Sequence, residues 1–371
     1  MNLPKDILEM KDKFKAAGKD FFLVGGCVRD FRMGVEPKDF DIVTNAFVDE
    51  MAEILHGYEI NKEGAMFGSL KVRKPGSTEF YEITTYREDL SVGRHPNIKI
   101  GVSLEEDSKR RDFTINSMYY DIDTGSIIDY NDGLEDIKAK AIKTIKPASL
   151  VLAQDRVRVL RAIRFKAQIG GKYHPAVFNS IAENNDISTL KQHRIMQEFY
   201  KGIKQSISVV EYLSDLKSFG ILEQIFKGNY SWGHFVESRV PEIVIARILT
   251  IMRLFLDESK SKIISKLVDE CLIDSKTAEG VVFLLLLENV NEDTAFTLEK
   301  ERIKTNITKE NIVEFNEHLK SIGNVSNYKN IDAFSKFKLS VNGNDLKQKG
   351  FTGANIGKEI QRLEKEKFLK I

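Results

Sequence analysis

The sequence has little of what secreted and membrane proteins usually carry. Its 371 residues include only two cysteines, Cys27 and Cys271, which are too few and too isolated for a disulfide framework or a zinc site. The first residues lack the apolar core of a signal peptide. The most apolar stretches, 281–287 and 243–256, are respectively too short to span a bilayer and interrupted by arginines. We therefore expect a cytoplasmic protein with no membrane partner, in which both cysteines are small buried apolar residues.

The chain also lacks a net charge that would announce its partner. The net charge is +1 with 30% charged residues, so any binding of nucleic acid has to come from local basic patches. The six histidines are scattered without metal-ligand spacing, and we assign none of them to catalysis. Their positions are His56, His95, His174, His193, His234 and His318. With 371 residues and 42% apolar content, the chain is long enough for more than one core.

The pattern of the sequence changes near Pro147. Before it, short strand-like runs alternate with turns, and after it the periodicity is helical almost to the end. We expect a helix with Ser149 as its N-cap that continues to Gly170, and further helices over 177–184 and 193–204. The pattern predicts the α+β class: a mixed α/β head with a small antiparallel-type sheet, then an all-helical neck, body and tail. The expected domains are 1–147, 148–205, 206–289 and 290–371.

Two neighbouring motifs suggest chemistry. The apolar run 21–24 predicts a buried strand that ends at Gly25 and Gly26, where backbone NH groups of a following helix can approach an anion. In the next strand-like run, Asp39 and Asp41 alternate with apolar residues, so both carboxylates share one face. Paired acids call for a cation, and Mg²⁺ held by two carboxylates and substrate phosphates is the economical choice. Either motif alone is usually a turn or a solvent-facing strand edge, but together they fit a nucleotidyltransferase.

Longer motifs extend this interpretation. LVGGCVRDFRMG, PKDFDIVTNA, RRDFTINSMYYD, QDRVRVLRAIRF and HRIMQEFYKGI follow one another between residues 21 and 205. In sequence and order they resemble the motifs of class II tRNA nucleotidyltransferases, the CCA-adding enzymes, and of the bacterial poly(A) polymerases that share their catalytic half. The resemblance implies template-independent addition of CCA to tRNA 3′ ends from CTP and ATP with Mg²⁺. It implies the tRNA 3′ end and acceptor stem as the RNA partner.

The resemblance also suggests catalytic residues. Asp39 and Asp41 would hold the metal ions, and a third acid in a neighbouring strand would be Glu82. Glu79 is the alternative if the register slips, and an outward-facing strand residue is the structural alternative for Glu82. Arg29 either contributes positive charge to the nucleotide site or forms a salt bridge, for example with the adjacent Asp30.

The RRD motif is the candidate for recognising the sugar. Following the family, Asp112 would accept a hydrogen bond from a ribose hydroxyl while an arginine contacts phosphate. In this interpretation the basic pair Arg110 and Arg111 holds Asp112 in place. Asn116 would share a face with Asp112 if this stretch were helical. As an isolated string, RRD would be a charged surface turn.

Asp155 and Arg158 are the candidates for selecting the base. In the family this pair forms a protein template, and Arg161 and Arg164 continue the stripe at helical spacing. Cytosine and adenine both present an amino donor beside a ring-nitrogen acceptor, so an aspartate and an arginine favour C and A together. Taken alone, the Asp155–Arg158 spacing is that of a surface ion pair.

The chain departs from the family at two positions. Gln154 and His193 stand where the family usually carries acids. Loss of these charges puts the orientation of Arg158 or Arg194 in question, while the template residues themselves remain.

Two further segments resemble parts of CCA-adding enzymes. The polar stretch 86–104, with Arg94 and His95 as weak contact candidates, resembles the flexible loop used to switch from C to A; a plain surface hairpin is the alternative. The segment 339–368 resembles their C-terminal tail, where glycines and lysines could contact RNA phosphates; a capped helix hairpin is the alternative. These tail residues are Gly350, Gly353, Gly357, Lys347, Lys349 and Lys358.

Several related functions stay open at this point. Within the same chemistry, the alternatives are a CC-adding enzyme, an A-adding enzyme and a poly(A) polymerase. From other classes come a catalytically inert tRNA-binding protein and a nucleotidyltransferase for small molecules.

Overall fold

The chain forms two compact units, Met1–Thr189 (unit 1) and Leu190–Ile371 (unit 2). The structure is a computed structural model, and it describes residues 1–37, 39–91, 97–226, 275–305, 307–321 and 327–371. The expected division into four domains is not tested by these two units and stays a prediction.

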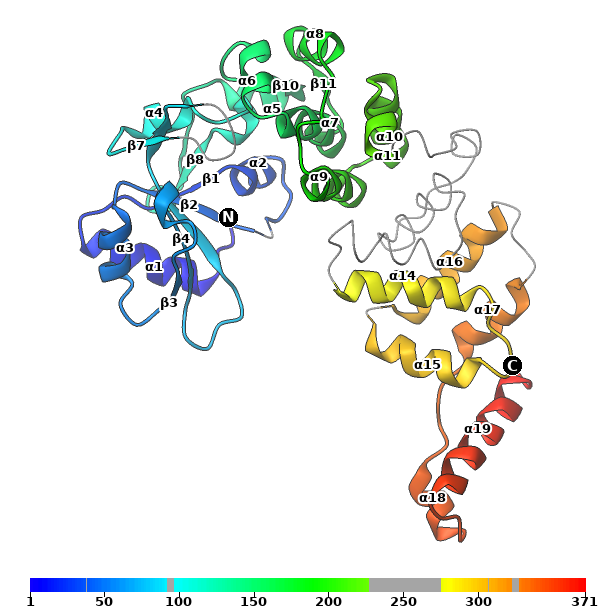
Figure 1. The fold of residues 1–371 in the computed structure, drawn as a ribbon. Coiled ribbons are helices and arrows are strands. Elements are labelled where there is room, and N and C mark those ends of the chain that lie inside the picture. The colour runs from blue at the N-terminus through cyan, green and yellow to red at the C-terminus, as the bar shows by residue number, and fades with distance from the viewer. Residues whose placement is uncertain (38, 92–96, 227–274, 306, 322–326) are drawn as a thin grey trace. The chain divides into compact units, whose positions relative to one another are not determined.

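Unit 1 begins with mixed helices and strands and becomes mainly helical after residue 147 (Figure 1). Its helices are α1 (Lys5–Ala16), α2 (Gly26–Arg32), α3 (Val48–Ile54), α4 (Leu104–Ser108), α5 (Gly133–Lys138), α6 (Ala148–Gln154), α7 (Val157–Ile169) and α8 (Pro175–Glu183), with 3-10 turns η1 (Ala65–Phe67) and η2 (Thr114–Asn116). Its strands are β1 (Phe22–Val24), β2 (Asp41–Thr44), β3 (Glu59–Asn61), β4 (Ser69–Arg73), β5 (Tyr81–Thr85), β6 (Arg87–Asp89), β7 (Ile98–Ile100), β8 (Tyr119–Asp121), β9 (Ile127–Ile128), β10 (Ala141–Ile142) and β11 (Lys172–Tyr173).

A seven-stranded sheet organises unit 1. Its strand order is β3-β4-β5-β2-β1-β8-β9. Strands β2 and β5 run parallel, and every other neighbouring pair in this sheet is antiparallel. The expected α+β class is therefore confirmed. The head sheet was expected to be small and of the antiparallel type, and the structure shows seven strands with one parallel pair, β2–β5.

One face of the sheet is covered by helices α1 and α3, which lie on the same side of it in Figure 1. Apolar residues of α1 recur at helical spacing, so they form one buried stripe. The core on this face includes Ile7, Met10, Phe14, Leu23, Ile42, Met51, Leu55, Ile83 and Tyr120.

The opposite face carries a smaller apolar cluster that includes Val24, Val43 and Tyr119. Side chains alternate along a strand. Because Ile42 and Ile83 face the larger core, Asp41 and Glu82 belong to this second face. The sheet thus places its acidic side chains on the less covered side.

Each strand-like run of the sequence contains a strand of the structure. These runs are 21–24, 39–44, 67–73, 78–86, 98–102, 126–130 and 141–145. Four short strands were not expected: β3, β6, β8 and β11. Strands β3 and β6 carry mainly polar residues, which gives little hydrophobic alternation to detect.

The expectation of one helix from Ser149 to Gly170 is wrong. The structure has two helices here, α6 capped at Pro147 and α7 beginning at Val157. Asp155 lies between them with an extended backbone, φ −146° and ψ 111°. Its side chain accepts a hydrogen bond from the backbone NH of Val157, 3.1 Å away, and this local bond competes with helix continuation. The expected end at Gly170 is confirmed by its left-handed conformation, φ 59°.

The described part of unit 2 is helical, in agreement with the expectation. Its helices are α9 (Gln192–Gln205), α10 (Val209–Ser218), α11 (Ile221–Phe226), α14 (Ser275–Leu287), α15 (Ala295–Lys304), α16 (Lys309–Ser321), α17 (Tyr328–Lys336), α18 (Gly343–Gln348) and α19 (Ala354–Phe368). Helices α9 and α10 pack closely because Gly202 leaves room for Tyr212, whose ring lies where a Cβ would be.

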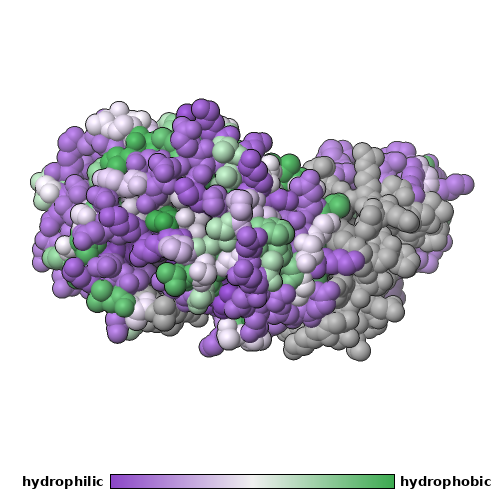
Figure 2. All heavy atoms as spheres, turned by 90° about the horizontal axis from the view of Figure 1, so that it is seen from above, coloured by the Kyte–Doolittle hydropathy of each residue, from purple (hydrophilic) through white to green (hydrophobic). Residues whose placement is uncertain are grey.

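The described surface seen in Figure 2 is mainly hydrophilic, with smaller apolar spots scattered over it. Among the described residues, no helix is both long and apolar enough to cross a membrane.

Candidate active site

Two carboxylates stand opposite each other on neighbouring parallel strands. In the β2–β5 register, Asp41 is the Cα partner of Glu82. Asp39 lies two residues before Asp41, just outside β2, which begins at Asp41. The structure thus brings Asp41 and Glu82 side by side on one face of the sheet, with Asp39 at the entrance to the strand.

The pKa of Asp41 is affected by both neighbouring acids, Glu82 and Asp39. The Asp41 side chain is open to solvent, yet desolvation by the surrounding protein raises its pKa, and the negative charges of Glu82 and Asp39 raise it further. The guanidinium groups of Arg111 and Arg161 oppose this rise. The site therefore holds an excess of negative charge beside two arginines.

Glu82 is held by neighbouring hydroxyls, which separates it from the alternative Glu79. The Ser69 hydroxyl donates to Glu82 Oε1 at 2.7 Å, and the Thr84 hydroxyl donates to Ser69 Oγ at 3.2 Å. Glu79 is exposed and precedes β5. Of the two acids, only Glu82 is paired in register with Asp41.

The glycine pair lies next to these acids. Gly25 has a φ of +78°, a conformation that side-chain-bearing residues rarely adopt, and a Cβ there would lie 3.7 Å from Asp41 Oδ2. Strand β1 ends at Val24 and α2 begins at Gly26, as expected. The Gly25 backbone therefore approaches the carboxylate site without a side chain in between.

Arg29 is buried beneath this site. Its Nε and Nη2 donate to Asp30 Oδ1 at 2.9 and 2.7 Å, so the salt bridge considered from the sequence is present. Its Nη1 donates to Asn116 Oδ1 at 2.7 Å. Asn116 ends the 3-10 turn η2 and Phe113 is extended, so no helix joins Asn116 to Asp112. The Asn116 Nδ2 is buried without a hydrogen-bond partner.

The arginines and the aspartate of the RRD motif have different ion-pair partners. Arg110 and Arg111 both bind Asp107, through Nε at 2.8 Å and Nη2 at 3.0 Å. Asp112 instead binds Arg161, whose Nε lies 2.6 Å from Asp112 Oδ2. The expectation that Asp112 is held by the adjacent basic pair is therefore corrected: its partner comes from α7. Sequence reasoning missed Asp107, although its i, i+3 and i, i+4 spacing to the arginines was a readable signal.

The Asp112–Arg161 pair is strongly charged. Asp112 is buried, and burial alone would raise its pKa, but Arg161, with support from Arg158, holds the pKa below its ordinary value. Asp112 Oδ1 also accepts the backbone NH of Phe113 at 2.9 Å. An ionised carboxylate in this setting is a hydrogen-bond acceptor with capacity left for a further donor.

A buried ring joins three of the arginines. The guanidinium groups of Arg29, Arg161 and Arg164 lie 5.1, 4.9 and 4.2 Å from the ring centroid of Phe165. Phe165 itself packs edge-on against Phe113 at 5.6 Å. Arg164 is buried here, whereas Arg161 reaches Asp112. Phe165 was not singled out from the sequence, because an apolar residue on a helix is usually core.

The base-selection candidates lie at the junction of α6 and α7. Arg158 Nη1 donates to Gln154 Oε1 at 2.8 Å and to the Val151 carbonyl at 3.1 Å. The neutral Gln154 thus still holds the Arg158 guanidinium, which addresses one of the two departures from the family. His193 lies on α9 in unit 2.

The remaining candidates lie in other parts of the chain. The segment 86–104 contains the antiparallel pair β6–β7, while Arg94 and His95 fall outside the described residues. In the tail, Lys347, Lys349 and Lys358 are exposed on or next to α18 and α19.

The expected burial of the cysteines is confirmed for Cys27. Cys27 is buried, and burial together with the nearby Asp41 raises the pKa of its thiol to about 12, so it is no nucleophile at neutral pH. Cys271 and His234 lie outside the described residues.

The donor set at the acidic site is that of a hard divalent cation, because it consists of carboxylates only. In the described part of the chain, no three His, Cys, Asp or Glu side chains form a ready-made metal cage. Mg²⁺ commonly binds through one or two carboxylates together with waters and substrate phosphates.

Comparison with known families gives an independent assignment of the head. Residues 21–143 match the family described as "Poly A polymerase head domain". This range contains the glycine pair, the three acids and the RRD motif.

Similar curated proteins carry two kinds of name. A "CCA-adding enzyme" of Lactobacillus johnsonii is 34% identical over 207 residues, covering 54% of this chain and 51% of that protein. The human "CCA tRNA nucleotidyltransferase 1, mitochondrial" is 33% identical over 200 residues, with 52% and 45% covered. "Poly(A) polymerase I" of Haemophilus influenzae is 28% identical over 265 residues, with 66% and 56% covered. The matches span about half the length of these relatives.

Solved structures extend the likeness in fold to nearly the whole chain. The Bacillus stearothermophilus CCA-adding enzyme in complex with CTP superposes with a TM-score of 0.63, covering 98% of this chain and 92% of that one at 22% identity. At this identity the likeness shows the fold, and that fold is the one expected from the sequence.

Proposed function

We propose, from the match of residues 21–143 to the poly A polymerase head domain, that the chain is a template-independent RNA nucleotidyltransferase. Its reaction is the addition of CCA to tRNA 3′ ends from CTP and ATP. The names of the curated relatives and the fold of the CCA-adding enzymes support this proposal. The proposal also places the protein in the cytoplasm.

The observation that carries the proposal is the arrangement of charge on the open face of the sheet. Asp41 and Glu82 are paired in register, the charges of Glu82 and Asp39 raise the pKa of Asp41, and Arg111 and Arg161 lower it. A carboxylate cluster beside arginines suits a nucleoside triphosphate, since the acids can hold cations and the arginines can hold phosphates.

Asp39 and Asp41, with Glu82 as the third acid, are the residues that would hold Mg²⁺. Carboxylate donors fit this ion, and a cation would also relieve the desolvation and the repulsion from Glu82 and Asp39 that raise the pKa of Asp41. When bound, such ions would activate the primer 3′-hydroxyl and neutralise the charge of the departing pyrophosphate. In the overall reaction the 3′-oxygen forms a bond to the α-phosphorus and the bond to the β-phosphate oxygen breaks.

The chain's own residues bind and orient the nucleotide. Arg110 and Arg111 would supply positive charge for the phosphates. Arg111 acts on Asp41, which lies beside Gly25, and the Arg29 guanidinium lies beside Gly26. Asp112, ionised and held by Arg161, can accept a hydrogen bond from the ribose hydroxyl. Nucleotidyl transfer needs positioning and charge neutralisation more than covalent catalysis.

Asp155 and Arg158 are the residues that would read the base. Asp155 can accept from the amino group of cytosine or adenine, and Arg158 can donate to the adjacent ring nitrogen. The Gln154 amide fixes one Arg158 nitrogen, and the other guanidinium nitrogens can point elsewhere. Arg161 and Arg164 lie on the same helix as Arg158, and their guanidinium groups lie near the Phe165 ring.

The RNA partner would be the tRNA 3′ end and acceptor stem. In the tail, the exposed Lys347, Lys349 and Lys358 are candidates for phosphate contacts. The division into head, neck, body and tail at residues 147, 205 and 289 belongs to this proposal, as does a switching role for the segment 86–104.

The test is an incorporation assay on tRNA transcripts that lack the last three nucleotides. The transcripts are incubated with CTP, with ATP or with both, and product lengths are read at single-nucleotide resolution. The proposal predicts two added residues with CTP alone and three with both nucleotides. Long ATP tails of variable length would identify a poly(A) polymerase instead, as the name of the Haemophilus relative allows.

Partial activities give distinct products in the same assay. Arrest after two residues with both nucleotides would indicate a CC-adding enzyme, and addition of A only to a transcript ending in CC would indicate an A-adding enzyme. Binding of tRNA without magnesium-dependent incorporation would favour an inert tRNA-binding protein.

A further inference from the structure

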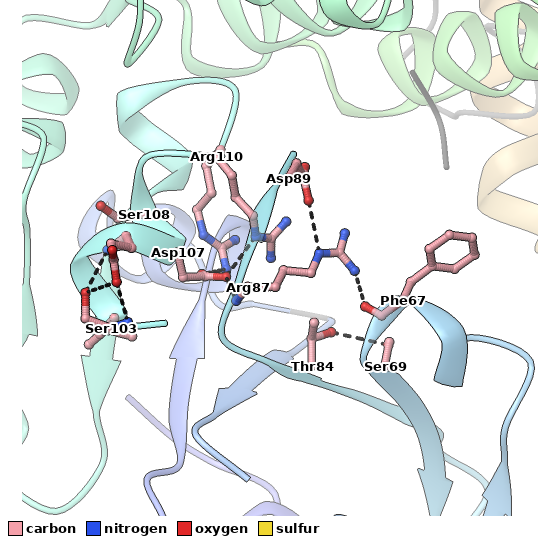
Figure 3. A network of polar contacts seen from close by, with 12 residues as sticks. Phe67, Ser69, Thr84, Arg87, Asp89, Ser103, Asp107, Ser108 and Arg110 are labelled. Atoms are coloured by element: carbon pink, nitrogen blue, oxygen red, sulfur yellow. Dashed lines mark hydrogen bonds and ion pairs between the residues drawn. The ribbon is translucent and has the colours of Figure 1, made fainter. Parts of the chain in front are cut away.

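Asp107 is the most fully bonded buried carboxylate near the candidate site. It lies on α4 with none of its surface exposed. Its Oδ1 accepts from the backbone NH of Arg87 at 3.2 Å and from Arg110 Nε at 2.8 Å. Its Oδ2 accepts from Arg111 Nη2 at 3.0 Å and from the Tyr119 hydroxyl at 2.8 Å. Four donors from three separate segments therefore meet on one side chain. Figure 3 labels two of the donor residues, Arg87 and Arg110, beside Asp107.

The charges in this group do not cancel. Burial opposes the ionisation of Asp107, but Arg111 and Arg110 hold its pKa well below its usual range, so it stays ionised. One carboxylate against two guanidinium groups leaves a surplus of positive charge. Arg111 also acts on Asp41. The surplus is therefore close to the acidic site.

We propose that Asp107 is a positioning residue that sets Arg110 and Arg111 for the phosphates of the incoming nucleotide. The inference rests on the proposed function. Asp107 holds Arg110 through Nε and Arg111 through Nη2, and the Tyr119 hydroxyl also accepts from Arg111 Nε at 3.4 Å. These bonds fix both guanidinium groups and leave the Nη1 donor of each for a ligand. Asp107 also restrains Arg111 from turning onto Asp41, where it would neutralise a carboxylate needed for the cation. Groups fixed in place before binding lose less conformational entropy when the ligand arrives.

The same carboxylate ties the arginines to the segment that supports Glu82. The side chain of Arg87 pairs with Asp89 at 3.3 Å and donates to the Phe67 carbonyl. Two residues later, Ser69 donates to Glu82. Figure 3 shows this path from Arg110 and Asp107 through Arg87 to Phe67 and the Ser69–Thr84 pair. Asp107 thus links Arg110 and Arg111, through Arg87, to the segment that supports Glu82.

The experiment compares Asp107→Asn with a matched control on the same helix. Asp107→Asn keeps the shape but removes the charge and replaces an acceptor by a donor facing Arg111 or Arg110. Glu106→Gln changes the neighbouring exposed residue, whose carboxylate accepts hydrogen bonds from Ser103 at the start of α4. CTP binding is measured by isothermal titration calorimetry on the full chain without tRNA, alongside thermal unfolding and the kcat and KM of nucleotide incorporation.

The expected result is CTP binding at least tenfold weaker in Asp107→Asn, which corresponds to about 1.4 kcal/mol, with Glu106→Gln equal to wild type. KM should rise accordingly in the incorporation assay. A residue with a structural role alone would lower the unfolding temperature while the folded protein bound CTP normally. That outcome overturns the proposal.

A second variant covers the case in which Asp107→Asn does not fold. Tyr119→Phe removes one donor from Asp107 and keeps the ring, so it should weaken CTP binding by a smaller factor, about twofold to fivefold. Unchanged CTP binding in this variant would then contradict the inference. The two proposals fail separately: a wild-type chain that binds CTP but adds nothing to tRNA refutes the proposed function, whereas the titrations still decide the role of Asp107.

Discussion

Removing the guanidinium of Arg161 should destabilise unit 1 by leaving a buried charge without its partner. Asp112 is 8% exposed and its Oδ2 lies 2.6 Å from Arg161 Nε. Loss of one partner of a buried ion pair typically costs about 3–5 kcal/mol. The Arg161 side chain is 30% exposed, so solvent screening lowers this value to about 2 kcal/mol. Loss of its contact with the Phe165 ring adds about 0.5–1 kcal/mol. For Arg161→Ala we therefore expect a loss of about 3 kcal/mol.

The origin of this loss can be tested with a double-mutant cycle. In Asp112→Asn the carboxylate charge is absent, so adding Arg161→Ala should then cost only about 1 kcal/mol, a coupling of about 2 kcal/mol. The assay is hydrogen exchange of the most protected amides of the head sheet, which reports the unfolding free energy of unit 1 separately from unit 2. Additive effects of the two changes, or a loss below about 0.5 kcal/mol for Arg161→Ala, would refute the reasoning.

The pair also predicts a direction with pH. The pKa of Asp112 is lower in the folded protein than its ordinary value of 3.8. A group of this kind contributes stability that is present above its unfolded pKa and lost as the pH falls through the folded pKa. The stability difference between wild type and Asp112→Asn should therefore be constant near neutral pH and shrink below about pH 4.

Three further results are expected. Asp155→Ala should lower discrimination against UTP more than it lowers turnover in single-nucleotide incorporation assays; an equal loss with all four nucleotides would remove Asp155 from base selection. Asp41→Asn should stabilise the free protein at pH 7 by about 0.5–1 kcal/mol in the same hydrogen-exchange assay. The reason is that the raised pKa of Asp41 makes its ionisation oppose folding as the pH rises above the unfolded pKa. An unchanged or lower stability would show that the ionised Asp41 does not oppose folding. Gly202→Ala should destabilise unit 2 by about 1–3 kcal/mol in thermal unfolding, because a Cβ would lie 2.1 Å from Tyr212 Cζ; an unaltered melting temperature would contradict the close packing of α9 and α10.

The sequence was informative where chemistry follows local pattern. The strand that ends at Gly25, the helix that follows it and the position of Glu82 beside Asp41 all follow from alternation, glycine placement and family resemblance. The change from mixed to helical structure near Pro147 was likewise readable from periodicity. These features depend on residues close together in the chain.

Features set by distant contacts were not readable. The partner of Asp112 is Arg161, 49 positions away, and the arginines next to Asp112 bind Asp107 instead. The spacing of Asp107 to these two arginines was readable, but nothing in the single sequence showed that Arg161 would be the partner of Asp112, because the two residues lie 49 positions apart. The break at Asp155 was missed for a different reason: its side chain and backbone act as a cap inside a periodic run that otherwise predicts one helix.

The most direct test of the central claim is nucleotide incorporation by the Asp39→Ala/Asp41→Ala double variant. Wild type and variant are compared with labelled CTP and ATP on tRNA lacking its last three nucleotides, with magnesium present and with circular dichroism to show that both are folded. The account predicts CCA addition by wild type and a loss of at least a thousandfold in the variant, about 4 kcal/mol of transition-state stabilisation. A folded variant that adds nucleotides at the wild-type rate would contradict it.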